Sequence, residues 1–152
     1  NASKFFSKNK EKFDLILIKQ TIHLLNFNEI KRLLKLSKEN LSHNGKVFIF
    51  TLDVRKNEIP TFKLMKSRLM TSLKRDRKII RMVTKLYPYR LKKRFIFRVK
   101  IIKSNYLNMI KNKYISTLLS LSNYEISKGL DEINLKYRKN ICFKDKLICM
   151  IL

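Results

Sequence analysis

Residues 13–25 read FDLILIKQTIHLL and decide the fold class. The first six, FDLILI, are short and nearly all apolar, which is typical of a strand buried on both faces of a sheet. Asn26 precedes Glu29 by three residues, a capping-box pattern that predicts the start of a helix. Asn44-Gly45 predicts the end of that helix, and residues 46–52 (KVFIFTL) predict a second buried strand. Strand, helix, Gly turn and strand form the repeating unit of a parallel sheet.

The rest of the chain continues the alternation of helices and strands. The patterns predict helices over 60–72, 74–86, 104–120 and 122–137, a strand over 94–102, and extended stretches over 141–143 and 147–152. We therefore predict an α/β fold with a mostly parallel sheet, in which residues 147–152 run antiparallel among the other strands. Because a buried first strand needs a neighbour, we expect residues 1–12 to be the remnant of a truncated upstream half and residues 13–152 to be the second half of a domain.

The charge balance is strongly basic, with 36 Lys and Arg against 11 Asp and Glu and a formal net charge of +25. Such a charge is typical of nucleic-acid-binding proteins. The chain also has only 2 Gly, 2 Pro and no Trp, while residues with A/T-rich codons are abundant. A coding bias with a solvated surface is the favoured explanation. A basic RNA-binding or ribosome-associated protein is the alternative, disfavoured because the aromatic residues lie mostly inside apolar segments.

Cysteine, histidine and hydropathy patterns exclude several other classes. Cys142 and Cys149 form no CxxC motif, so we interpret them as small core residues in a reducing compartment and expect a cytoplasmic protein. The apolar stretch 13–25 is too short and too polar to span a membrane, and no membrane partner is expected. His23 and His43 are separated by a helix and have no carboxylate cluster, so no metal site is predicted.

The opening stretch resembles the fourth strand, and the loop after it, of class I S-adenosylmethionine-dependent methyltransferases. One branch of this superfamily has a pattern like FDxVLxKExIHHI there, which Lys19, Ile22 and His23 match, whereas Gln20 replaces the usual acid and Leu24 replaces a second His. Four further segments are similar to the same branch in the same order: 41–51, 58–62, 106–137 (YLNMIKNKYISTLLSLSNYEISKGLDEINLKY) and 142–148. The resemblance covers nearly the whole chain from Phe13.

The resemblance implies the second half of a Rossmann-like methyltransferase fold. The intact parent would transfer a methyl group from S-adenosylmethionine to a small-molecule or unassigned acceptor. In such enzymes a Gly-rich turn and an acidic residue in the first half hold the cofactor. Gly45 and Gly129 stand alone in this sequence, so we expect the fragment to be inactive by itself.

The candidate site residues follow from the resemblance and from their positions after predicted strands. Lys19 and Gln20 are the predicted cofactor contacts, and His23 is the predicted general base. His23 is four residues past Lys19, so a helical turn would place the two on one face. The alternatives are a packed or exposed polar loop residue for His23 and a buried helix face for Tyr114. The predicted substrate contacts are Thr51, Arg55, Lys111, Lys113 and Tyr114.

Overall fold

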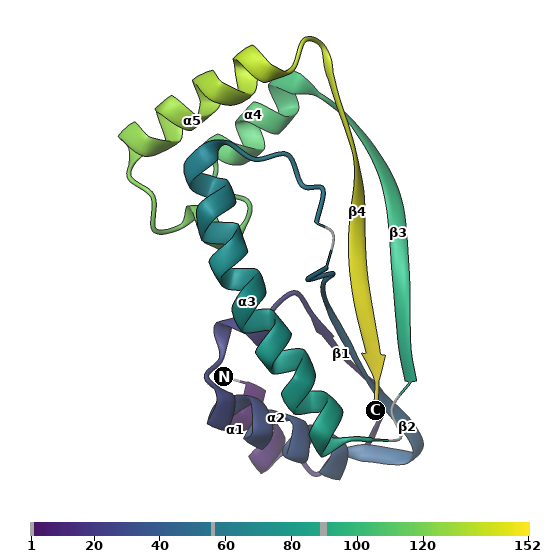
Figure 1. Cartoon of the computed structure of the whole chain (residues 1–152). Coiled ribbons are helices and arrows are strands. Elements are labelled where there is room, and N and C mark those ends of the chain that lie inside the picture. The colour runs from purple at the N-terminus through teal and green to yellow at the C-terminus, as the bar shows by residue number, and fades with distance from the viewer. Residues whose placement is uncertain (1, 56, 89–90) are drawn as a thin grey trace. The chain divides into compact units, whose positions relative to one another are not determined.

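A computed structural model describes residues 2–55, 57–88 and 91–152 (Figure 1). Residue 1 of the predicted N-terminal remnant lies outside the described residues. The elements, in chain order, are α1 (Ala2–Lys8), β1 (Phe13–Lys19), the 3-10 helix η1 (Ile22–Leu24), α2 (Phe27–Glu39), β2 (Leu41–Leu52), α3 (Lys63–Leu86), β3 (Leu91–Ile102), α4 (Lys103–Lys111), the 3-10 helix η2 (Ser116–Leu118), α5 (Asn123–Lys136) and β4 (Asn140–Ile151).

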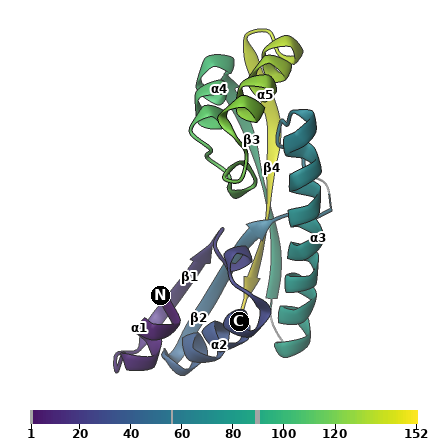
Figure 2. The same cartoon turned by 90° about the vertical axis from the view of Figure 1, so that its left-hand side faces the viewer.

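The sheet has four strands in the order β1-β2-β4-β3. Strands β1 and β2 are parallel and lie side by side in Figure 2, and β4 pairs with β2 in the antiparallel direction from Phe48↔Ile151 to Leu52↔Leu147. The prediction of a mostly parallel, Rossmann-like sheet is wrong, because only the β1–β2 pairing is parallel. The last strand, β4, lies between β2 and β3 and runs antiparallel to both.

The boundary between α2 and β2 differs from the prediction. The capping box of Asn26 and Glu29 is confirmed at the start of α2, but the helix ends at Glu39 and β2 begins at Leu41. Gly45 therefore lies inside β2 and does not end the helix. A Cβ there would be 2.6 Å from the carbonyl oxygen of Phe13, so glycine is needed because the backbone of β1 approaches closely.

Three other predicted boundaries change. Helix α3 is one helix of 24 residues, not two, because no glycine or proline interrupts its buried row between Leu69, Leu73 and Ile80. It begins at Lys63 and not at Pro60. Helix α4 ends at Lys111, well before residue 120. The two extended stretches at the C-terminus are a single strand, β4, of 12 residues.

The chain divides into two compact units, of which the first comprises Asn1–Asp53, Arg75–Phe95 and Leu147–Leu152. In this unit one face of the β1–β2 pair is buried, and its side chains are apolar except for Thr51. The opposite face is open, since Leu15 and Leu17 are 54% and 55% exposed. The buried residues of the pair and of the helical segments in this unit include Ile16, Ile18, Val47, Ile49, Ile30, Leu33, Leu34, Ile79 and Val83.

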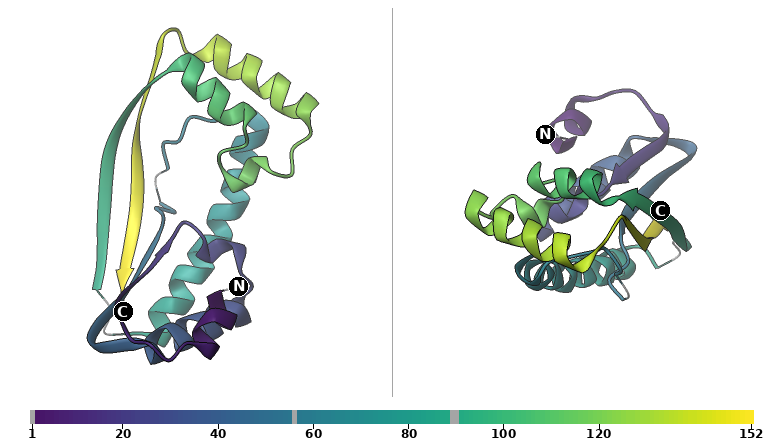
Figure 3. Two further views of the ribbon diagram at one scale, coloured as in Figure 1. Left: turned by 180° about the vertical axis from the view of Figure 1, so that it is seen from behind. Right: turned by 90° about the horizontal axis from the view of Figure 1, so that it is seen from above.

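The second unit comprises Val54–Lys74 and Ile96–Lys146. Helices α4 and α5 pack together in it (Figure 3). The predicted capping box of Ser122 and Glu125 is confirmed at the start of α5. The core of this unit consists of Phe62, Met65, Tyr106, Ile110, Leu118, Leu121, Ile126, Ile133 and Ile141.

The structure bears on the predictions about the two cysteines and about membrane-spanning segments. Both cysteines are free, but only Cys149 is buried; Cys142 is exposed, so its interpretation as a core residue is wrong. Its position explains the error, because it alternates with the buried Ile141 along β4 and thus points to the other face. Within the part of the chain described, no helix has the length and apolar character that crossing a membrane requires.

Candidate functional site

The carboxyl ends of β1 and β2 bring several predicted residues to one edge of the first unit. Lys19 is the register partner of Phe50, and the backbone N–H of Gln20 donates to the Phe50 carbonyl at 2.9 Å. Gln20 then adopts a φ of 56°, a left-handed conformation that turns the chain away from the sheet. The parallel pairing therefore places Lys19, Gln20 and Thr51 near each other. Thr51 is only 2% exposed, so a substrate could not reach its side chain, as the predicted role requires, without a local rearrangement.

His23 lies in η1, directly after this turn. Because η1 begins at Ile22, Lys19 is not part of it and the two side chains do not share a helical face as expected. The backbone of η1 is fixed by Arg75 of α3, whose guanidinium donates to the carbonyls of His23 at 2.5 Å and Leu25 at 2.6 Å. This double contact holds the histidine segment against α3.

Asp76, the neighbour of Arg75, is a site residue that the sequence analysis missed. Its side chain is buried at 6% exposure, and its Oδ1 has no hydrogen-bond partner among the described residues. Burial raises the pKa of the Asp76 carboxyl, while the charges of His23 and Arg75 act in the opposite direction. A signal was present, because Asp76 occupies the apolar row of α3 between Leu73 and Ile80.

His23 and Asp76 are the residue types that general-base catalysis uses. An imidazole titrates near neutral pH and can accept a proton from a hydroxyl or amine. A carboxylate beside it orients the ring and stabilises the imidazolium form after proton transfer. The pair is therefore suited to general-base chemistry.

Asp53, which follows β2, is also buried in the first unit. It is 3% exposed, and its Oδ2 lies 2.9 Å from Nε of Arg94 on β3. A buried carboxylate paired at this distance is held as part of the fold. Arg55, a predicted substrate contact, is exposed and belongs to the second unit.

The predicted substrate contacts after α4 also belong to the second unit. Lys113 has a φ of 51°, and its Nζ donates to the Leu121 carbonyl at 2.6 Å, which fixes the turn after α4. Tyr114 lies with its hydroxyl 3.1 Å from that of Tyr106. Burial raises the pKa of both phenols. Lys113 and Tyr114 thus have structural contacts, while Lys111 is exposed. Lys19, Gln20 and His23 belong to the first unit.

The described residues do not fit the whole of S-adenosylmethionine. Lys19 and Gln20 lie at the strand edge, where they could contact part of it, but no glycine cradle accompanies them. Gly45 packs against β1 and Leu41, and a Cβ on Gly129 would be 2.7 Å from the Phe62 ring. Neither glycine is placed to admit a ribose or an adenine. Any binding of the cofactor would therefore need further residues.

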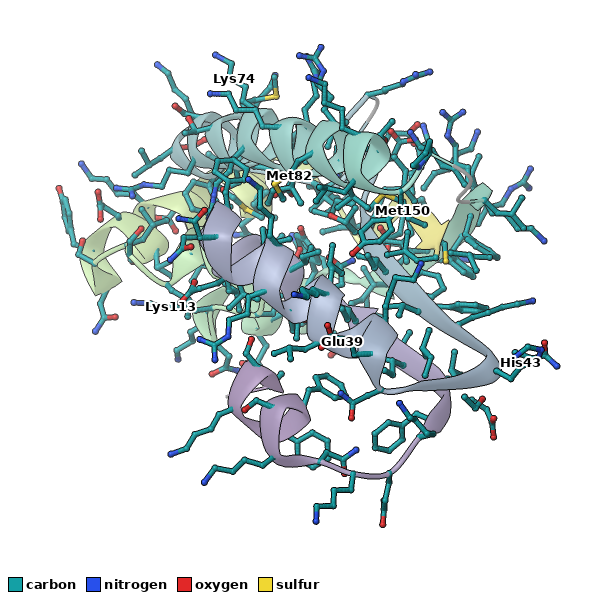
Figure 4. All side chains as sticks on the ribbon, turned by 90° about the horizontal axis from the view of Figure 1, so that it is seen from below. Glu39, His43, Lys74, Met82, Lys113 and Met150 are labelled. Carbon is teal, nitrogen blue, oxygen red and sulfur yellow. The ribbon has the colours of Figure 1, made fainter. Side chains whose placement is uncertain are left out.

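No metal centre is formed by the residues that the structure describes, because no three His, Cys, Asp or Glu side chains gather in a suitable cluster. His43 is exposed on β2, labelled in Figure 4.

Comparison with known proteins does not assign a family. No protein-family model matches the sequence, and no curated protein matches it significantly. The geometry of the first unit and the resemblance in the sequence therefore carry the functional argument.

Proposed function

We propose that this chain supplies the proton-accepting part of an S-adenosylmethionine-dependent methyl-transfer site, with His23 as the general base. The observation that carries the proposal is that Arg75 donates to the carbonyls of His23 and Leu25, which places η1 against the part of α3 that holds the buried Asp76. His23 lies in the segment, FDLILIKQTIHLL, that most directly carries the methyltransferase resemblance. Two independent features, a sequence pattern and the contact of Arg75 with the backbone of η1, thus point to the same segment.

The chain's own residues have separate tasks in this proposal. His23 accepts the proton of the hydroxyl or amine that receives the methyl group, and Asp76 stabilises the resulting imidazolium. Arg75 keeps η1 in place through its two carbonyl contacts. A positioned general base contributes on the order of 10²–10⁴ to a rate. Lys19 and Gln20 would contact part of the cofactor, which would supply the methyl group when bound.

The acceptor is a small molecule or another molecule that the sequence does not specify. A cytoplasmic location agrees with the two free cysteines, one of which is exposed, because an exposed thiol persists most readily in a reducing compartment.

The test uses the product of the longest open reading frame that contains this sequence. The purified protein is incubated with S-adenosylmethionine and a small-molecule extract, and S-adenosylhomocysteine is measured. His23→Ala should lower single-turnover product formation by about tenfold or more, which corresponds to about 1.4 kcal/mol in the barrier. Asp76→Asn should lower it less, because the base remains while its orientation and charge stabilisation are lost.

Lys31→Ala is the matched control, since Lys31 is an exposed residue of α2 in the same unit. Its rate should equal that of the unchanged protein when every variant is assayed well below its own unfolding temperature. Absence of S-adenosylhomocysteine, or equal rates for the His23 and Lys31 variants, would contradict the proposal.

A further inference from the structure

The two strands of the second unit present a polar face on the side away from its core. Ile101 of β3 and Phe143 of β4 pack against the core of the second unit. Because side chains alternate along a strand, the residues between them point to the opposite side. The residues on this outward face are Arg98 and Lys100 of β3 and Cys142 and Lys144 of β4, all of them exposed.

Cations face each other across these strands. The backbone N–H of Lys103 donates to the carbonyl of Lys139 at 3.0 Å. In a regular antiparallel ladder continued from this bond, Arg98 lies opposite Lys144, with Lys100 as their diagonal neighbour. Like charges directly opposite each other destabilise a sheet. The arrangement therefore has a cost in stability that a bound anion would remove.

These side chains surround a hollow of about 420 Å³. Its lining consists of Glu58, Arg98, Val99, Lys100, Cys142, Phe143 and Lys144. Glu58 is the only carboxylate in this lining, and it is engaged by the Lys146 ammonium and by the backbone N–H of Lys144. Arg98 and Lys100 have no ion-pair partner in the described parts of the chain. The hollow is therefore electropositive.

We propose that this hollow binds the phosphodiester backbone of a single-stranded nucleic acid. An arginine presents paired donors that match phosphate oxygens, and lysines add point charges beside it. A small anion is a poorer fit, because small ligands need enclosing walls, whereas β3 is an exposed edge strand. A polymer instead gains affinity from several phosphates, and the net charge of +25 would steer it to the protein. This binding site is independent of the methyl-transfer proposal.

The first test measures fluorescence anisotropy of a labelled oligouridylate with the 152-residue chain at several salt concentrations. The variant Arg98→Gln/Lys100→Gln should bind about 25-fold more weakly at 0.1 M salt, since each lost contact to a single strand removes about 0.7 from the salt slope. The slope itself should fall by about 1.4. The matched control is Lys66→Gln/Lys74→Gln, which changes the same charge on exposed positions of α3 in the same unit; Lys74 is labelled in Figure 4.

The control should change affinity by about twofold or less, and circular dichroism should show that both variants remain folded. Equal losses in the two variants would overturn the proposal, since they would show that diffuse charge alone attracts the RNA. Polyglutamate competing as well as unlabelled RNA would also overturn it, because a phosphate site discriminates against carboxylate polymers.

A second test needs no variant and uses Cys142 as a reporter inside the hollow. Cys142 is exposed and Cys149 is buried, so iodoacetamide should modify Cys142 first. Saturating oligouridylate should slow this alkylation at least fivefold, a change that mass spectrometry of the labelled peptide measures. Binding of the RNA with an unchanged alkylation rate would place the ligand elsewhere and refute the site.

Discussion

Gly129 in the middle of α5 provides a sharp test of the second unit's packing. In an isolated helix, replacing an interior glycine by alanine stabilises by about 0.8–1.0 kcal/mol. Here a Cβ would lie 2.7 Å from three ring carbons of Phe62, which is 2% exposed in the core. Overpacking of this kind costs about 1–3 kcal/mol. Gly129→Ala should therefore lower the free energy of unfolding by about 1 kcal/mol, within a range of roughly 0–2.

Urea unfolding followed by circular dichroism measures this change, and two further variants separate its causes. Ser127→Ala, on the exposed side of the same helix, should be slightly stabilising because only helix propensity acts there. In a Phe62→Leu background the clash is relieved, so adding Gly129→Ala should become stabilising. If Gly129→Ala alone stabilises the protein by about 1 kcal/mol, Phe62 does not lie over this position and the described packing is wrong.

The other predictions concern a cap, a buried carboxyl and an ion pair. Ser122→Ala should cost about 1 kcal/mol in urea unfolding, because the backbone N–H of Glu125 loses its acceptor; no loss would show that this cap contributes nothing. Asp76→Asn should raise stability at pH 7, because the buried carboxyl has a raised pKa and its charged form is disfavoured. That gain should shrink as the pH falls through the raised folded-state pKa towards 3.8, and a gain that persists at pH 3 would contradict the assignment. Arg94→Gln should lower the free energy of unfolding by about 1–3 kcal/mol in thermal unfolding, because the buried Asp53 loses a cation at 2.9 Å. The double variant Asp53→Asn/Arg94→Gln should lose less stability, and an equal loss would exclude charge pairing as the cause.

Structural features that depend on contacts between residues close in the chain could be predicted from the sequence. The capping boxes at Asn26 and Ser122 each join residues three apart, so the sequence contains both partners of every bond. The apolar runs of β1 and the later part of β2 were also found, because burial selects apolar residues directly. The start of β2 was missed, since it depends on pairing of Leu41 with Phe13, and nothing in the intervening sequence specifies that pairing.

The same distinction applies to the candidate site. His23 follows a strand that the sequence reveals, so its position at a strand edge could be predicted. Arg75 and Asp76 lie more than fifty residues away on α3, and the contact of Arg75 with the His23 carbonyl depends on how that helix packs against η1. The basic face of β3 and β4 could not be predicted from the sequence, because Arg98 and Lys144 become neighbours only when the two strands pair.

The alternation of helices and strands, the two helix caps and the basic charge can be predicted from the sequence alone. Composition can be counted directly, and periodicity and short-range hydrogen bonds depend on residues near each other in the chain. Tertiary structure alone decided that β4 enters the sheet between β2 and β3 and makes it mostly antiparallel. It also decided which charged groups pair, as Asp53 and Arg94 do. Strand order and such contacts depend on long-range packing, in which burial of apolar surface across the whole unit outweighs any local preference.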